Sequence, residues 1–232
     1  NPLLENTHWE PLCGGARVLV SPEHGFGTDA VLLAHFATPA RGGAGQTWVR
    51  LRGDSLLWRV RTQAGVHHWV ELQEKAVQQA ERSVAENGFS ATVGIVRGDA
   101  RRLSDLFPAG SLDGIACNPP YTPPGAGIPC GDAARRTARQ GDTLSLEDLA
   151  REARCALRFG GRLCLCLRPQ RLGQGGGVLF PKRFQLEPKR LRLCQQRPGK
   201  APFLLLLECR RGGRPGMDVG PVLLFEGEDG RP

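Results

Sequence analysis

Four consecutive residues, Asn118-Pro119-Pro120-Tyr121, combine groups that can bind and activate an amine on an aromatic ring. Deprotonating such an amine is difficult, so an enzyme can instead accept both amine hydrogens and draw the nitrogen lone pair toward a methyl donor. The Asn118 side-chain oxygen and the Pro119 carbonyl are suitable acceptors, and two prolines stiffen their loop. Tyr121, the only tyrosine in the chain, offers a ring on which an unstacked base can lie. The alternative is an ordinary proline-rich turn.

Two acidic residues stand at the ends of other predicted strands. Glu71 closes VHHWVEL, where a carboxylate can accept hydrogen bonds from the ribose of a nucleotide-like cofactor. Asp99 closes the next strand, where its side chain can meet the adenine amine of such a cofactor. The alternatives are a solvated strand end for Glu71 and a helix N-cap for Asp99. Open α/β sheets bind ligands at the carboxyl ends of their strands, so both residues and Asn118 are candidates for one site.

Helices and strands must alternate to position these residues. Apolar spacing predicts helices over 29–37, with Thr28 as a plausible N-cap, and over 73–87 and 146–158. Strands are predicted over 66–72, 91–96, 112–117 and in RLCLCLR. This alternation is typical of a parallel, doubly wound α/β sheet. Further on, two apolar runs flank the basic QQRPGK, which indicates an antiparallel pair.

The composition indicates a single soluble domain. The 232 residues, 40% of them hydrophobic, suffice for one core. We expect an N-terminal cofactor-side segment to about 40, a degenerate first strand and loop over 41–69, a core over 70–170, and basic C-terminal strands over 171–232. Apolar spans and a signal-like start are missing, which favours the cytoplasm. The eight cysteines lie in apolar runs without zinc spacing, so we expect free thiols, no metal and a monomer.

Positive charge is concentrated in the C-terminal half. Residues 130–216 contain 19 lysines and arginines against 7 acidic residues, while the whole chain carries a net charge of +8. Such a field attracts the phosphate backbone of nucleic acids. The alternative is a set of solvated arginines. The candidate RNA-binding residues flank the late apolar runs: Arg190, Arg192, Arg197, Lys200, Arg210 and Arg211.

Several segments carry a resemblance to a known family: GFGTDAVLLAHFA, VELQEKAVQQAERSVAENGF, VRGDARRL, DGIACNPPY, SLEDLAREARCALRFGGRLCLCLRP and LEPKRLRLCQQRPGKAPFLLLLECRRGGRPG. Together they resemble the bacterial valine-tRNA adenine-N6 methyltransferases, which modify the adenine beside the anticodon. The resemblance implies a Rossmann-like, seven-stranded and mostly parallel methyltransferase sheet with an antiparallel C-terminal strand, and S-adenosyl-L-methionine as the cofactor. It places Thr28, Asp29, Gly53 and Asn118 near the cofactor, Glu71 at its ribose, Asp99 at its adenine, and residues 118–121 at the target base.

The pattern breaks where the first strand should end in a glycine-rich loop. That loop must pass close to the cofactor, which excludes side chains. The corresponding stretch reads GQTWVRLRGDSLLW, and only Gly53 remains. Reading one nucleotide later turns the codons of Trp48, Trp58 and Trp69 into glycine codons. We therefore hypothesise that about residues 47–69 are translated out of frame, and we expect weak cofactor binding.

Three other functions compete with RNA methylation. A protein-glutamine N5-methyltransferase would use the same chemistry, but its family carries a helical domain ahead of the sheet, and only about 45 residues precede the first strand here. A catalytically impaired RNA-binding relic is compatible with the altered loop. A dinucleotide oxidoreductase would leave the NPPY motif unexplained and needs a G-x-G-x-x-G loop.

Overall fold

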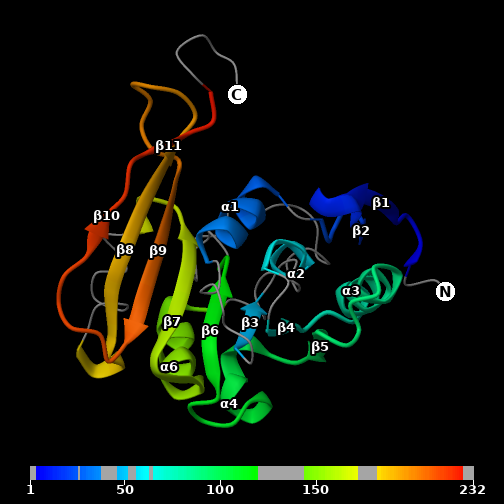
Figure 1. The fold of residues 1–232 in the computed structure, drawn as a ribbon, viewed down its shortest axis with the longest axis horizontal. Helices are drawn as coiled ribbons and strands as arrows, with labels where there is room; N and C mark the ends of the chain where they lie inside the picture. Colours follow the sequence, from blue (N-terminus) through cyan, green and yellow to red (C-terminus); the bar gives the residue numbers. More distant parts are fainter. Residues whose placement is uncertain are drawn as a thin grey trace, which may run out of the picture.

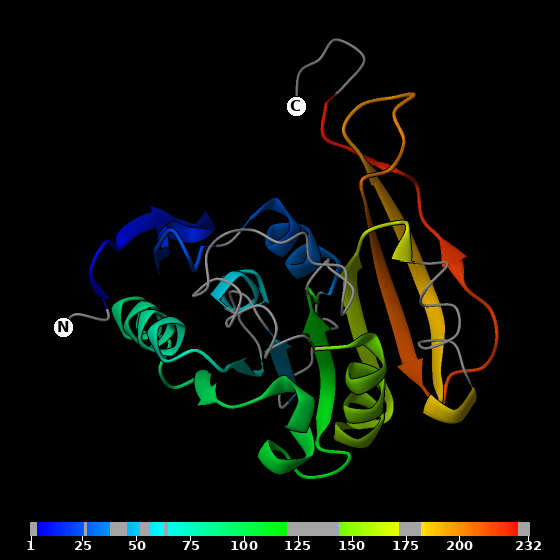
Figure 2. The same ribbon diagram turned by 180° about the vertical axis from the view of Figure 1, so that it is seen from behind.

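Strands and helices alternate along the chain and build a twisted sheet covered on both faces (Figures 1 and 2). The computed structural model describes residues 4–25, 27–37, 46–51, 56–62, 65–119, 144–171 and 182–226. Its helices are α1 (Thr28–Phe36), α2 (Leu56–Thr62), α3 (Glu74–Glu86), α4 (Leu103–Leu106) and α6 (Leu146–Ala156), with short 3-10 turns η2 (Cys13–Gly15), η3 (Ala100–Arg102) and η4 (Lys182–Phe184).

The main sheet has the order β10-β8-β9-β7-β6-β3-β4-β5, and β11 also pairs with β8. Its longer strands are β3 (Thr47–Leu51), β4 (Val66–Glu71), β5 (Val93–Arg97), β6 (Leu112–Cys117), β7 (Leu157–Leu167), β8 (Leu186–Gln195) and β9 (Leu204–Arg211). The strands β10 (Asp218–Val219) and β11 (Leu223–Leu224) have two residues each. Strands β3 to β7 pair in parallel, whereas β9 is antiparallel to both β7 and β8. The predicted mostly parallel sheet with an antiparallel C-terminal strand is confirmed.

Strand β3 lies at the centre of the sheet, between β4 and β6, and its side chains alternate between two cores. Val49 and Leu51 join the core that contains Leu149 of α6. Trp48 joins the core that contains Leu33 of α1 and residues of α2. Each face of the strand is therefore buried, as expected for the interior of a parallel sheet.

Most predicted helices and strands are present, with small shifts at their ends. Helix α3 ends at Glu86 with Asn87 as its C-cap, and Gly88 follows with φ +68°, a conformation that glycine adopts easily. Helix α6 is capped by the Ser145 hydroxyl, and it ends earlier than predicted because β7 begins at Leu157. The predicted N-cap Thr28 is wrong: Gly27 is the N-cap of α1 and Thr28 is its first residue.

One helix and one hairpin in the N-terminal half were not predicted. Helix α2 follows β3, where the sequence indicated a loop, and it buries Leu56, Leu57 and Trp58. The hairpin of β1 (His8–Pro11) and β2 (Arg17–Val20) packs on α3, where Leu19 N donates to Ser83 Oγ at 2.9 Å. This hairpin holds the start of the loop that leads to α1.

Within the described ranges, no helix is long and apolar enough to cross a membrane. No group of three or more potential metal ligands occurs in that same part of the chain. The seven cysteines described there form no disulfide with one another.

Candidate functional site

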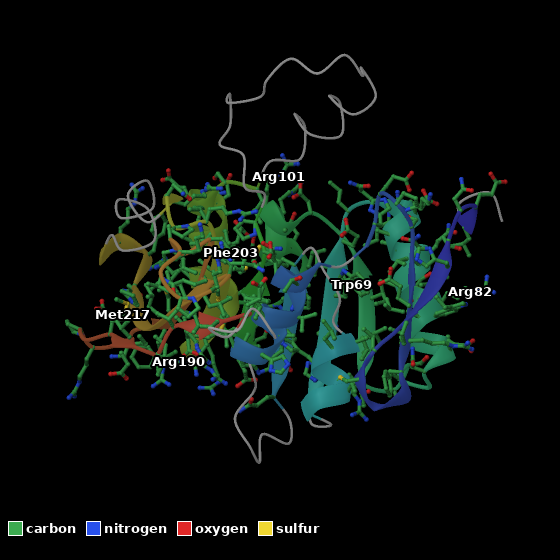
Figure 3. The ribbon with its side chains drawn as sticks, turned by 90° about the horizontal axis from the view of Figure 1, so that it is seen from above. Trp69, Arg82, Arg101, Arg190, Phe203 and Met217 are labelled. Carbon is green, nitrogen blue, oxygen red and sulfur yellow. The ribbon has the colours of Figure 1, made fainter. Side chains whose placement is uncertain are left out.

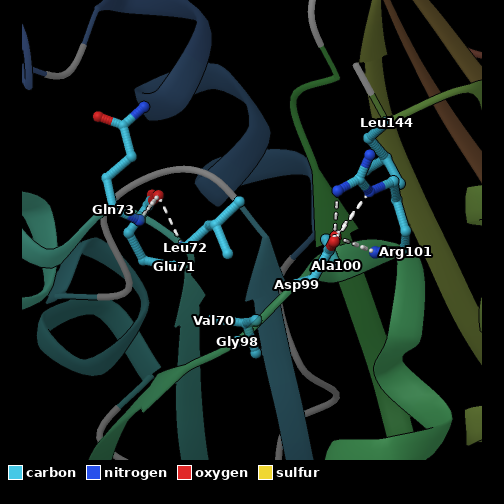
Figure 4. Close-up of a pocket in the computed structure, with 9 residues that line it drawn as sticks. All are labelled: Val70, Glu71, Leu72, Gln73, Gly98, Asp99, Ala100, Arg101 and Leu144. Carbon is cyan, nitrogen blue, oxygen red and sulfur yellow. Dashed lines mark hydrogen bonds and ion pairs between the residues drawn. The ribbon is translucent and has the colours of Figure 1, made fainter. Parts of the chain in front are cut away.

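Glu71, Asp99 and Asn118 stand at one edge of the main sheet. Glu71 is the last residue of β4, Asp99 follows β5 by two residues, and Asn118 comes directly after β6. These strands are parallel, so their carboxyl ends meet at this edge. We call it the carboxyl edge. Glu71 and Asp99 also line one pocket (Figure 4), whose walls are Val70, Glu71, Leu72, Gln73, Gly98, Asp99, Ala100, Arg101 and Leu144.

The Glu71 carboxylate is held at the start of α3. Its Oε1 atom accepts hydrogen bonds from Leu72 N at 2.9 Å and from Gln73 N at 3.2 Å. Among the described residues none donates a hydrogen bond to Oε2. Glu71 therefore presents a carboxylate of fixed orientation with one oxygen available to a ligand. This geometry suits the recognition of ribose hydroxyls.

Asp99 serves as the N-cap of η3, which was the alternative interpretation of this residue. Its Oδ1 accepts from Arg101 N at 2.8 Å, and its Oδ2 accepts from Arg101 Nη2 at 2.6 Å. The hydrogen bond from the Arg101 side chain lowers the pKa of Asp99, although partial burial opposes it. The carboxylate is thus ionised at neutral pH. A role toward the cofactor adenine stays a prediction.

Asn118 offers a buried acceptor. Its Oδ1 atom is shielded from solvent, and no donor reaches it from the described part of the chain. Pro119, which follows it, is buried. An amide oxygen without a donor in a protein interior is costly, because it has lost its bonds to water. Pro120 and Tyr121 lie outside the described residues.

Thr28 and Asp29 form the first turn of α1 but do not line the pocket of Glu71 and Asp99. Their turn lies near β3, because Arg50 Nη2 donates to the Ala30 carbonyl at 3.3 Å. Asp29 also lies toward β8, where its charge contributes to the raised pKa of Cys194, a shift caused mainly by burial. Gly53 lies outside the described residues. The cofactor contacts predicted for these three residues remain predictions.

The six candidate RNA-binding residues do not form one surface. Arg190 donates to the Phe36 carbonyl at 2.6 Å and to Glu208 at 2.9 Å. Arg192 donates to the Pro221 carbonyl, and Arg211 to the Leu157 carbonyl. These three side chains hold the C-terminal strands in place. Figure 3, which looks onto the carboxyl edge, shows Arg190 far from Arg101 and on the other side of the sheet.

Sequence reasoning missed two residues near the pocket. Arg101 forms an ion pair with Asp99. The sequence RGDARR is basic, but it does not show which arginine pairs with the aspartate. His24 lies in the loop before α1, where Ser21 and His24 exchange backbone hydrogen bonds of 3.1 Å. Burial lowers the pKa of His24, and the nearby charge of Glu71 opposes this shift. No sequence pattern singled out His24, because its proximity to Glu71 depends on how the β1–β2 hairpin packs.

The sheet order, with a carboxylate-lined pocket at its carboxyl edge, is that of the Rossmann-like fold found in methyltransferases. A predicted O-methyltransferase from Agrobacterium tumefaciens has the same fold, with a TM-score of 0.67 and 20% identity, covering 87% of this chain and 89% of that one. No known family profile matches the chain.

Named relatives narrow the class. A tRNA1(Val) (adenine(37)-N6)-methyltransferase from Tolumonas auensis is 32% identical over 194 residues, which is 78% of this chain and 74% of the relative. A protein of the same name from Serratia proteamaculans is 32% identical over 155 residues, covering 64% of this chain and 56% of the relative. The chain therefore belongs to the tRNA1(Val) (adenine(37)-N6)-methyltransferase family, as its motifs indicated.

Proposed function

We propose that this protein uses S-adenosyl-L-methionine to methylate the N6 amine of an adenine in tRNA. The observation that carries the proposal is the buried Asn118 Oδ1, which no described residue supplies with a hydrogen-bond donor. An adenine amine would provide that donor. The proposal includes a monomer that acts in the cytoplasm.

The pocket residues fit the nucleoside part of the cofactor. Glu71 would accept hydrogen bonds from the ribose through Oε2, and ionised Asp99 would accept one from the adenine amine. When bound, the cofactor supplies an electrophilic methyl group. Asn118 would bind one hydrogen of the target amine, and this orients the nitrogen lone pair. Such a preorganised acceptor stabilises the charge that develops during transfer.

The test is an Asn118→Ala substitution, assayed by transfer of a labelled methyl group to tRNA. Losing one preorganised contact typically lowers turnover by about 100- to 1000-fold. Cofactor binding and thermal unfolding should stay near those of the parent. Asn118→Asp, which keeps an acceptor oxygen, serves as the matched control and should lose less turnover. An alanine variant that retains more than about a third of the activity would refute the role of Asn118.

A catalytically impaired RNA-binding relic is the second candidate. The observation that favours it is the composition of β3, where Arg50 is fully buried one residue before the strand ends. A relic would bind tRNA without binding the cofactor. Calorimetry with S-adenosyl-L-methionine separates the two candidates, because only the enzyme releases heat of binding.

A further inference from the structure

The turn between β8 and β9 lies at the same edge of the sheet as Asn118. Strand β9 is antiparallel to both β7 and β8, so β8 runs parallel to β7 and ends at the carboxyl edge. We call residues 196–203 the hairpin tip. In Figures 1 and 2 it projects beyond the rest of that edge. Arg210 and Arg211 end β9 at the opposite edge, beside the start of β7 and β8.

The hairpin tip has a defined conformation. Lys200 N donates to the Arg197 carbonyl at 3.2 Å, and Gly199 between them has φ +77°. Phe203 anchors the base of the tip, because its carbonyl accepts from Arg168 at 3.1 Å and its ring lies 5.4 Å from that of Phe225. The tip is therefore held by neighbouring strands rather than by its own charged side chains.

Arg197 and Lys200 are exposed, and neither side chain makes a hydrogen bond or ion pair within the described chain. They differ in this respect from Arg190, Arg192 and Arg211, whose guanidinium groups bind protein carbonyls. Cations of this kind can release condensed counterions when they meet phosphates. Glu226 accepts a hydrogen bond from Gln196 at the start of the tip.

We propose that the hairpin tip, through Arg197 and Lys200, contacts the phosphates of the RNA whose adenine reaches Asn118. This inference rests on the proposed function. The strand register places Cys117 level with Leu165 and Leu207. At about 3.3 Å per residue, the tip extends roughly 20 Å beyond that level. A folded RNA spans such a distance, whereas a mononucleotide does not.

The experiment compares two double variants that change the net charge equally. Arg197→Glu with Lys200→Glu alters the tip, and Arg154→Glu with Arg214→Glu alters exposed cations remote from the carboxyl edge. Fluorescence anisotropy with a labelled valine-tRNA transcript measures the dissociation constant between about 50 and 200 mM salt. The tip variant should bind about 10- to 100-fold more weakly, with a salt slope smaller by roughly 1.5. The control should stay within about threefold.

Several results would overturn the proposal. Equal weakening in both variants would mean that the basic half attracts RNA only as a diffuse field. The proposal would also be overturned if the tip variant bound tRNA as tightly as the parent, or if the parent did not bind tRNA. Binding of polyglutamate by the parent as tightly as tRNA would overturn it as well. Arg197→Gln with Lys200→Gln repeats the test with a smaller change, and thermal unfolding checks the fold. This assay measures RNA binding and not methyl transfer. A failure of the tip proposal can therefore be told apart from a failure of the proposed role of Asn118.

Discussion

Replacing Gly114 with alanine should destabilise the protein, because the ring of Trp48 occupies the space beside this glycine. Trp48 of β3 and Gly114 of β6 are paired in the sheet. A Cβ atom added at Gly114 would lie 2.3 Å from Cε3 and Cζ3 of Trp48 and 2.4 Å from Cδ2. Separations below 3.0 Å cannot be sustained, so the ring or a strand must move.

The ring has little freedom to move. Trp48 is fully buried, and the Trp58 ring packs edge-on against it at 5.3 Å. The Arg162 guanidinium lies over it at 4.8 Å from the ring centre. Overpacking of such a core costs about 1–3 kcal/mol. For a chain of this length each kcal/mol lowers Tm by about 2–4 °C, so we expect a decrease of about 2–12 °C.

Urea and thermal unfolding measure this change. Gly220→Ala is the matched control, because the same methyl group there meets only ordinary contacts at 3.7 and 3.9 Å. In a double-mutant cycle with Trp48→Leu, the cost of Gly114→Ala should fall by more than about 0.5 kcal/mol. If Gly114→Ala were as stable as the Gly220 control, or if the cycle showed no coupling, Trp48 would not occupy the space beside Gly114.

Two further predictions concern pH and the cofactor. Burial lowers the pKa of His68 and of His24 from the ordinary value of 6.5, so the unfolded state binds more protons as the pH falls below neutrality. The free energy of unfolding should therefore decrease as the pH falls through 6.5. His68→Phe keeps the ring contact with Phe107 and should make the free energy of unfolding, measured by urea titration at several pH values, less dependent on pH. An unchanged pH dependence would contradict the assignment to His68. As encoded, the chain should bind S-adenosyl-L-methionine measurably but weakly in calorimetry, whereas a version with about residues 47–69 re-encoded one nucleotide later should bind it more tightly. Low-micromolar binding by the unmodified chain would contradict this expectation.

The sequence was sufficient to predict elements whose periodicity is strong and local. Helix α3 and strand β6 were predicted to within about one residue, because their apolar spacing and flanking signals agree. The β1–β2 hairpin was missed because its short strands are stabilised by distant residues, such as Val84 packing with Val18 and Val20. Gly14 and Gly15 between the two strands are a turn signal, but two strands of four residues each give a pattern too brief to interpret.

The positions of the candidate site residues on the sheet could also be predicted, whereas their roles stay predictions. The rule for parallel strand ends placed Glu71, Asp99 and Asn118 on one edge, because strand direction alone determines this. The roles of the basic residues could not be predicted the same way. An arginine such as Arg190 has the same sequence signature whether it faces solvent or donates to the Phe36 carbonyl. Arg197 and Arg210 lie at opposite edges of the main sheet because β9 runs antiparallel to β8, and only the structure shows this.

Strand β3 shows why folding and cofactor binding make separate demands on one segment. As encoded, Trp48 fills space beside Gly114, and Arg50 lies 5.6 Å from the Trp58 ring centre, so the strand packs as a central element. A cofactor instead needs bare backbone just beyond Leu51, where glycine permits close approach. Re-encoding the segment would supply glycines but remove both tryptophan rings, and loss of a buried tryptophan costs about 3–5 kcal/mol. Removing the buried Arg50 charge would offset part of that cost. Cofactor affinity and stability of the re-encoded chain therefore need separate measurements, because a gain in the first does not require a gain in the second.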